Sequence, residues 1–320
     1  MNASEINMPS LFICVTPLQM LIAEKIIDKT RPVNIEIIVL AYQKNDKYMH
    51  YIKRLEKKCT NFTVLAVTPK NKFVTVIAFA KLHTILNKNM SKTYSEVYLS
   101  SIDNKYVQLI VSKLNYARLY TFDDGTANII KSSAYYQEEK KTLKTNILRW
   151  IFGINKGLQE IKSEICKHYT IYPSVSNIVS NTELIEMFTQ CKKRKQDKKV
   201  VRVFIGQPFD ELGIPLSLIE EFFFKYKMDY YYPHPREKII NNKFTYIHSH
   251  LIFEEYIIEG LQHQDIVYKI YGAVCTSILN LASSKNDIEI CSIYTDELRT
   301  KYSDYYALAE KMNITLLKLT

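Results

Sequence analysis

The feature that most constrains the fold is an alternation of short apolar runs with segments that carry apolar residues at helical spacing. In the first half of the chain this pattern predicts strands over 11–16, 35–42, 62–67, 96–100 and 117–122. Between these runs lie segments of helical periodicity, such as 17–28 and 105–114. Because strands that alternate with helices pair in parallel through crossover connections, the first half is predicted to form a parallel α/β sheet.

The same alternation starts again after a basic cluster, CKKRKQDKK, at 191–199. Strands are predicted over 200–206, 228–232, 265–272 and 287–294. We therefore expect an α/β protein of two Rossmann-like domains, 1–190 and 200–320, joined by a charged linker. Two doubly wound domains that face each other leave a cleft, and ligands bind at the carboxyl ends of such strands.

Four polar turns follow four predicted strands, and their convergence is stronger evidence for a site than any one motif. These turns are FDDGTANI, GQPFDELG, PHPR and GAVCTS, which begin at residues 122, 206, 233 and 272. In the first turn, Asp123 and Asp124 fit either a turn or helix cap or a sugar-binding pair of acids. Gly125 would allow the chain to turn tightly beside a ligand, next to Thr126.

The other three turns supply acid, base and anion-binding groups. Pro233 and its neighbouring proline hold His234 in a rigid loop, and His234 with Arg236 would suit an anion. Asp210, in the loop that starts at Gly206, is a natural acid–base partner for His234.

The turn that starts at residue 272 opens a predicted helix. Thr276 and Ser277 would either hold a phosphate there or simply cap that helix.

Composition narrows the classes of partner. The net charge of +10 fits a nucleic acid, an anionic membrane face or an anionic small substrate. No aromatic residue is interleaved in the basic cluster, so it is interpreted as a solvated linker rather than a nucleic-acid patch, and a peripheral membrane contact stays open.

Neither a resident metal nor a dinucleotide cofactor is predicted. The six cysteines form no CxxC pair, so we expect no metal site and mostly buried, reduced thiols. No G-x-G-x-x-G follows the first strand, which disfavours a dinucleotide cofactor. The chain shows no signal peptide and no run of about 20 apolar residues. We therefore expect a cytoplasmic protein, and we expect it to be a homodimer.

At this point the residues resemble a known family. FDDGT followed by Asn and Ser-Ser, then a strand with a G-x-P-acid loop, then PHPR, is similar to the bacterial lipooligosaccharide sialyltransferases of glycosyltransferase family 52. The opening CVTPLQMLIAEKI and the segments FEEYII and YKIYG also fall in that family's order. The resemblance covers nearly the whole chain, and the DDGT and PHPR blocks are its most specific parts.

The resemblance implies a GT-B architecture and metal-independent transfer of sialic acid, with inversion, from CMP-sialic acid to a terminal galactose. It places the base at Asp210 and the general acid at His234. Phe209 stands between the proline and the acid, which departs from the family pattern by one residue. Neighbouring sialyltransferase families take the base from the DDG motif, so Asp124 and Asp123 compete for that role.

The resemblance also implies contacts with the substrates. It points to Glu254 or Glu255 for the cytidine ribose, against a solvated helix face as the plain alternative. It also places Thr16 and Gln19 beside the substrate.

The chemistry of the donor agrees with a basic site. CMP-sialic acid carries a carboxylate and a phosphodiester, which a basic site attracts. The alternatives are another CMP-sugar-dependent enzyme of the same fold, a sialyltransferase of different linkage, and a non-catalytic binder of an anionic polymer or a nucleic acid.

Overall fold

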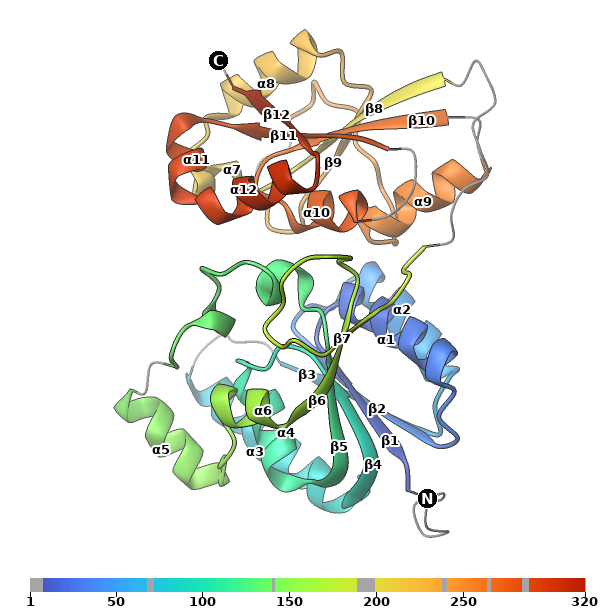
Figure 1. The fold of residues 1–320 in the computed structure, drawn as a ribbon, viewed down its shortest axis with the longest axis vertical. Helices are drawn as coiled ribbons and strands as arrows, with labels where there is room; N and C mark the ends of the chain where they lie inside the picture. The colour runs from blue at the N-terminus through green and yellow to red at the C-terminus, as the bar shows by residue number, and fades with distance from the viewer. Residues whose placement is uncertain are drawn as a thin grey trace. The chain divides into compact units, whose positions relative to one another are not determined.

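The computed structural model describes residues 8–67, 72–139, 142–188, 199–237, 241–263, 266–283 and 288–319. The chain divides between Met187 and Phe188 into two compact units, which Figure 1 colours from blue to green and from yellow to red. Most of the basic cluster, residues 191–198, lies outside the described residues.

A seven-stranded parallel sheet forms the centre of the first unit, in the order β3-β2-β1-β4-β5-β6-β7. Its strands are β1 (Ser10–Cys14), β2 (Ile35–Ala41), β3 (Asn61–Ala66), β4 (Thr93–Leu99), β5 (Asn115–Phe122), β6 (Ile165–Thr170) and β7 (Thr182–Leu184). The chain builds outward from β1 to β3 and then returns to β4 on the other side of β1. This reversal creates a switch point between β1 and β4, where ligands bind in doubly wound sheets.

Helices cover both faces of this sheet (Figure 1). They are α1 (Pro17–Thr30), α2 (Asp46–Glu56), α3 (Lys72–Lys88), α4 (Lys105–Lys113), α5 (Leu143–Phe152) and α6 (Leu158–Glu164), with 3-10 turns η1 (Gly125–Asn128) and η2 (Ala134–Tyr136). Buried side chains of β1, β2 and β4 pack with those of α3, α4 and α6 in one apolar core. Every residue of β1 and β2 is buried, as expected for parallel strands that helices cover on both faces.

The second unit contains a five-stranded parallel sheet in the order β12-β11-β10-β8-β9. Its strands are β8 (Lys199–Ile205), β9 (Tyr230–Tyr232), β10 (Ile266–Gly272), β11 (Glu289–Tyr294) and β12 (Thr315–Lys318). Its helices are α7 (Phe209–Leu212), α8 (Leu216–Lys225), α9 (Phe253–His263), α10 (Thr276–Ala282), α11 (Asp296–Lys301) and α12 (Ser303–Lys311). Here the switch point lies between β8 and β10.

The predicted α/β class with parallel sheets is confirmed in both units. The apolar runs at 11–16, 35–42 and 265–272 correspond to β1, β2 and β10. The expectation that most cysteines are buried is wrong for the described ones. Cys14 is buried, whereas Cys59, Cys275 and Cys291 are partly exposed and Cys166 is exposed.

Candidate active site

The predicted site residues of the first unit gather at the switch point of its sheet. Thr16 and Gln19 follow β1, the turn with Asp123 and Asp124 follows β5, and the turn that starts at Ser100 follows β4. These segments lie far apart in the sequence, and their hydrogen bonds join them at the carboxyl ends of the strands.

Asp124 is the polar centre of this group. Its Oδ1 accepts a hydrogen bond from Gln19 Nε2 at 2.6 Å. Its Oδ2 accepts from Ser101 Oγ at 2.8 Å and from the Tyr135 hydroxyl at 2.7 Å. Asp124 directly precedes η1, but its side chain makes no capping hydrogen bond to that turn. The simple capping alternative therefore does not account for this carboxylate.

Asp123 faces the opposite way, into the interior of the unit. Its side chain is fully buried and lies 2.9 Å from Nε2 of the buried His168. Its second oxygen accepts from the Thr170 hydroxyl and from the backbone N–H of Ile171, at 2.8 and 2.6 Å. The expectation that Asp123 contacts a substrate is therefore not supported, because both of its oxygens are occupied and no part of it reaches the surface.

Gly125 has φ of +55°, a left-handed conformation that favours glycine. This geometry turns the chain directly after Asp124, as the sequence predicted. Thr126 follows in η1 and is partly exposed beside it.

Thr16 and Gln19 form a reciprocal capping box at the start of α1. Gln19 is fully buried, and its Oε1 accepts from the backbone N–H of Val15 at 2.6 Å. Its amide NH₂ then reaches Asp124 and Ser101. Gln19 is thus a buried hydrogen-bonding partner of Asp124, and the substrate contact that the resemblance implied for it stays a prediction.

Sequence reasoning missed Ser101 and Asp103, which follow β4. Ser101 has φ of +52°, a conformation that costs a non-glycine residue energy and is concentrated at functional sites. Burial and the nearby charge of Asp124 raise the pKa of the Asp103 carboxyl above its ordinary value. The positive φ of Ser101 cannot be predicted from the sequence. Asp103 is a single acid in the polar turn SSIDN, and such a residue does not by itself indicate a functional site.

In the second unit, three loops meet at the switch point of the sheet. Asp210 lies on the short helix α7 after β8, and its side chain is exposed. Arg236, which follows β9, forms an ion pair of 2.9 Å with Glu211, the residue next to Asp210. Both side chains are solvent-exposed, so this pair contributes little to the stability. Gln207 donates through its amide to the carbonyl of Val274, after β10, at 2.7 Å. The Asp210 loop therefore contacts both of its neighbours.

The ring of His234 is oriented by its own loop. Its Nδ1 accepts a hydrogen bond from the backbone N–H of Arg236 at 3.1 Å. In the neutral imidazole this bond places the proton on Nε2, so Nε2 is the atom that donates. His234 is partly exposed, as is Pro233 before it.

Glu237, which was also not predicted as a site residue, connects two of these loops through hydrogen bonds. Its carboxylate accepts from the Tyr231 hydroxyl at 2.6 Å and from the backbone N–H of His234 at 3.1 Å. The backbone N–H of Gln207 also bonds to it, and burial raises the pKa of this carboxyl to about 7.

Gly206 makes room for this arrangement. A Cβ at Gly206 would lie 2.5 Å from Glu237 Oε1 and 2.5 Å from Tyr231 Cε1. The absence of a side chain is thus what lets the Glu237 carboxylate reach the loop after β8.

The remaining predicted donor-binding residues differ in their access to solvent. Glu254 is only 4% exposed, and its Oε1 accepts from Asn280 Nδ2 at 2.6 Å. Glu255 is partly exposed in the first turn of α9. Of the two acids, Glu255 is therefore the better candidate for the ribose. Thr276 and Ser277 are partly exposed and begin α10.

Within the described ranges no three His, Cys, Asp or Glu side chains gather in a way that could hold a metal ion. The helices of the described segments are likewise too short or too polar to cross a membrane.

The chain matches the model of Glycosyltransferase family 52 over residues 34–297. It belongs to this family. It is 32% identical to the CMP-N-acetylneuraminate:beta-galactoside alpha-2,3-sialyltransferase of Pasteurella multocida, over 97% of this chain and 99% of that protein. It is 31% identical to the N-acetyllactosaminide alpha-2,3-sialyltransferase of Haemophilus influenzae, over 92% of this chain and 94% of that protein.

The fold of this family 52 member is also similar to a solved glycosyltransferase structure. The match is to Arabidopsis thaliana UGT89C1 complexed with UDP-L-rhamnose, with a TM-score of 0.52 and 11% identity, covering 98% of this chain and 85% of that one. Because the two sequences are only 11% identical, this similarity is evidence for the fold alone. It confirms the GT-B class that was expected.

Proposed function

We propose that this enzyme transfers sialic acid from CMP-sialic acid to the terminal galactose of a lipooligosaccharide or similar glycan, with inversion and with an α-2,3 linkage. The observation that carries the proposal is the 32% identity, along nearly the whole of both chains, to a protein named for this reaction on β-galactosides. The Haemophilus influenzae relative carries a name of the same linkage.

The acid in this proposal is His234. As sialic acid leaves CMP, negative charge develops on the phosphate, and a donor aimed at that oxygen lowers the barrier. The bond from the Arg236 N–H to Nδ1 leaves the proton of the neutral ring on Nε2, so this ring would stabilise the leaving phosphate by donating a hydrogen bond from Nε2. Transfer of a full proton would use the imidazolium, whose Nδ1 carries a proton and cannot accept this bond. Arg236 adds a positive charge in the same exposed loop, and Pro233 restricts that loop.

The base in this proposal is Asp210, which would take the proton of the acceptor hydroxyl. Its loop follows β8 and the His234 loop follows β9, and these strands pair directly. Glu237 bonds to backbone groups of both loops. An acid and a base on two adjacent loops can serve the two faces of one anomeric carbon, which is the arrangement an inverting transfer needs.

Asp124 remains the competing base. Against that role stand the three hydrogen bonds that its carboxylate already accepts from Gln19, Ser101 and Tyr135. These bonds fix the orientation of the carboxylate within the first unit. We therefore assign Asp124 to holding the acceptor side of the site in shape, with Gly125 and Thr126.

The nucleotide would be held by the second unit and the acceptor by the first. Thr276 and Ser277 would offer hydroxyls to the phosphate, and Glu255 would take the ribose hydroxyls. No metal enters this scheme, because the histidine, the arginine and the hydroxyls would bear the phosphate charge.

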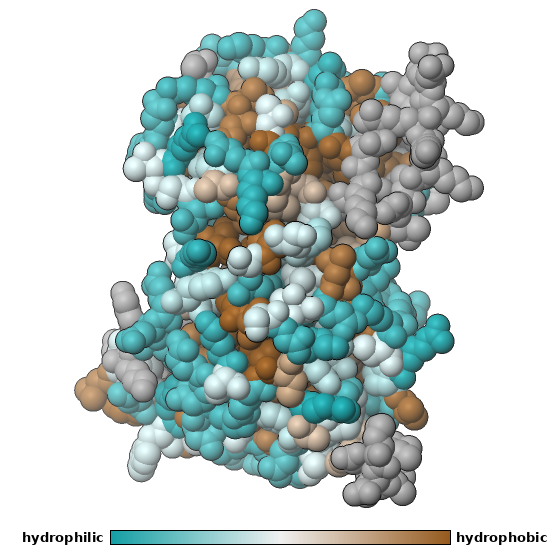
Figure 2. Space-filling model, in the orientation of Figure 1, coloured by the Kyte–Doolittle hydropathy of each residue, from teal (hydrophilic) through white to brown (hydrophobic). Residues whose placement is uncertain are grey.

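A lipid-linked acceptor would require the enzyme to approach a membrane. Helix α5 exposes Leu143, Ile147, Trp150 and Ile151, which are 50–84% exposed, and Figure 2 shows apolar side chains at the surface over α5. We propose this face for peripheral membrane contact. Trp150→Ser should therefore reduce the fraction of enzyme that floats with anionic vesicles. If this variant still floats but no longer forms the expected homodimer, the face is instead the contact between two copies of the chain.

The reaction is tested by measuring CMP release from CMP-sialic acid with a panel of galactosides, followed by digestion of the product with a linkage-specific sialidase. We expect turnover with β-galactosides and a product that an α-2,3-specific sialidase cleaves. Turnover only with another CMP-sugar, or salt-dependent binding to nucleic acid without any effect of CMP, would contradict the proposal.

A further inference from the structure

The first unit contains a cavity of about 440 Å³ next to the Asp124 cluster. It is lined by Tyr42, Thr75, Phe79, Ser101, Asp103, Asn104, Lys105, Tyr106, Thr145 and Leu148. Ser101 belongs to both sites, because it lines the cavity and donates its hydroxyl to Asp124. The cavity lies in the size range of small-molecule sites, about 300–1,000 Å³.

The aromatic part of the lining is held in place by named contacts. The rings of Phe79 and Tyr106 stack with centroids 4.2 Å apart. Asn104 donates to the Tyr42 hydroxyl at 3.0 Å and accepts from the backbone N–H of Tyr106 at 2.9 Å. The site therefore presents fixed apolar ring surfaces rather than adaptable side chains.

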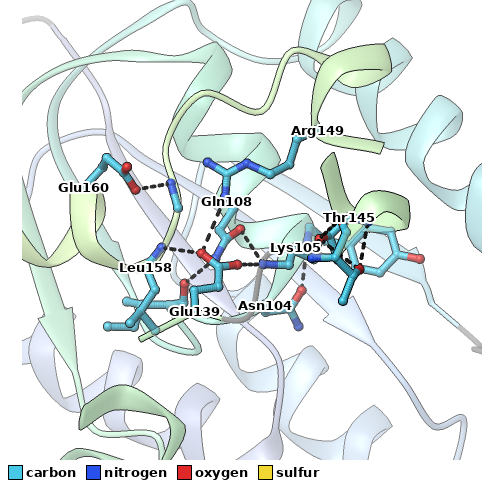
Figure 3. Close-up of polar contacts among 12 residues, drawn as sticks. Asn104, Lys105, Gln108, Glu139, Thr145, Arg149, Leu158 and Glu160 are labelled. Carbon is cyan, nitrogen blue, oxygen red and sulfur yellow. Dashed lines mark hydrogen bonds and ion pairs between the residues drawn. The ribbon is translucent and has the colours of Figure 1, made fainter. Parts of the chain in front are cut away.

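A polar network fastens the wall that α5 provides (Figure 3). Glu139 lies between Lys105 of α4 and Arg149 of α5, pairs with both, and accepts from the backbone N–H of Leu158 at 3.3 Å. Lys105 also donates to Gln108 at 3.1 Å. The charge of Lys105 is thus already directed at a carboxylate of this chain.

The charges of the lining favour a neutral ligand. Asp103 is an acid in the wall, its pKa is raised by burial and by the charge of Asp124, and Lys105 is paired with Glu139. A phosphate or a carboxylate would compete with both Asp103 and Glu139 for the single positive charge of Lys105, which costs free energy in a partly buried site. Hydroxyl groups, in contrast, can donate to Asp103 while the apolar face of a sugar ring lies on an aromatic ring.

We propose that this cavity is a subsite for a neutral sugar ring of the acceptor glycan, with Asp103 accepting its hydroxyls and the rings of Tyr42 and Tyr106 packing against it. The inference rests on the proposed function for the identity of the ligand. It adds that the first unit holds the acceptor beyond the hydroxyl that reacts.

The test uses the full-length chain and two variants of the lining. Thr75→Trp fills the cavity from α3, and Asp103→Asn keeps the shape but removes the charge. Val76→Trp is the matched control, because Val76 is the next residue of the same helix and is 50% exposed. N-acetyllactosamine binding is measured by saturation-transfer NMR without donor, acceptor KM by CMP release, and CMP binding by calorimetry.

We expect Thr75→Trp to weaken disaccharide binding and raise the acceptor KM by about tenfold or more, which corresponds to about 1.4 kcal/mol. Asp103→Asn should also raise the acceptor KM, and both variants should bind CMP like the wild type. Val76→Trp should change none of these values. If Thr75→Trp does not fold, as its melting curve will show, Asp103→Asn alone decides.

A wild-type acceptor KM in the folded variants, or an equal loss in Val76→Trp, would overturn the subsite. Failure of the proposed function looks different. In that case the wild-type enzyme itself would release no CMP with any galactoside, whatever the variants do.

Discussion

Replacing Gly206 with alanine would place a methyl carbon where the structure has no room for one. The new Cβ would lie 2.5 Å from Glu237 Oε1, 2.7 Å from Glu237 Oε2 and 2.5 Å from Tyr231 Cε1. Tyr231 cannot retreat easily, because it is 3% exposed and its ring stacks on Phe244 with centroids 4.9 Å apart. The Glu237 carboxylate must therefore move, and this motion releases the loop of His234.

The expected cost has two parts. Overpacking of this kind destabilises a protein by about 1–3 kcal/mol. A shift of about 1 Å in a catalytic group lowers the rate by about 10²-fold. We therefore expect Gly206→Ala to fold with reduced stability in urea and to lose about two orders of magnitude in the turnover of CMP-sialic acid.

Gly213→Ala is the matched control for this prediction. Gly213 lies in the same loop with φ of +72°, and a Cβ there would meet nothing within 4 Å. It should cost about 1–2 kcal/mol through left-handed strain alone and leave the Glu237 contacts intact. Wild-type turnover in Gly206→Ala, or the same loss of turnover in both variants, would refute the role of Glu237 in holding the His234 loop.

Four further outcomes are expected. Asp210→Asn should keep CMP affinity and lose about 10²- to 10⁴-fold in transfer, as is typical for a general base, whereas near-normal rates with an inactive Asp124→Asn would reassign the base to the DDG turn. Transfer should persist in excess EDTA, and abolition with rescue by magnesium or manganese would contradict the metal-free scheme. His234→Ala should slow the CMP donor severely and an activated aryl sialoside much less, so equal losses with both would show that His234 does not act on the leaving phosphate. Because burial raises the pKa of Glu237 from 4.5 to about 7, the folded state holds the extra proton in this range, and the free energy of unfolding should fall as pH rises from 4.5 to 7. Glu237→Gln should flatten this slope in urea titrations, and an unchanged slope would show that another group titrates.

Most of the fold could be predicted because its signals are local. The runs that became β1 and β2 are almost wholly apolar, as parallel strands buried on both faces must be, and the run that became β10 is mainly apolar. The capping box of Thr16 and Gln19 likewise depends on residues three positions apart. The helices α5 and α6, between β5 and β6, were not predicted.

The candidate site was predicted as a set of loops but not in its internal contacts. The polar turns after β5, β8, β9 and β10 were expected at the carboxyl ends of strands, and each lies there. The sequence near Asp123 and Asp124, however, does not indicate that the two side chains bond to different partners. Asp123 turns inward to His168, 45 residues away, and Asp124 turns to Gln19, 105 residues away.

The two α/β units, the family and the loops that hold the candidate residues could all be predicted, because hydrophobic periodicity and turn chemistry act over a few neighbouring residues. Which of those residues stay accessible depends on how the two units fold. Gln19 and Glu254 became buried hydrogen-bonding partners, whereas Glu237 and Asp103 acquired raised pKa values. The physical reason is that burial and long-range hydrogen bonds arise from segments that meet only when the sheets form, and both depend on the whole surroundings of a side chain.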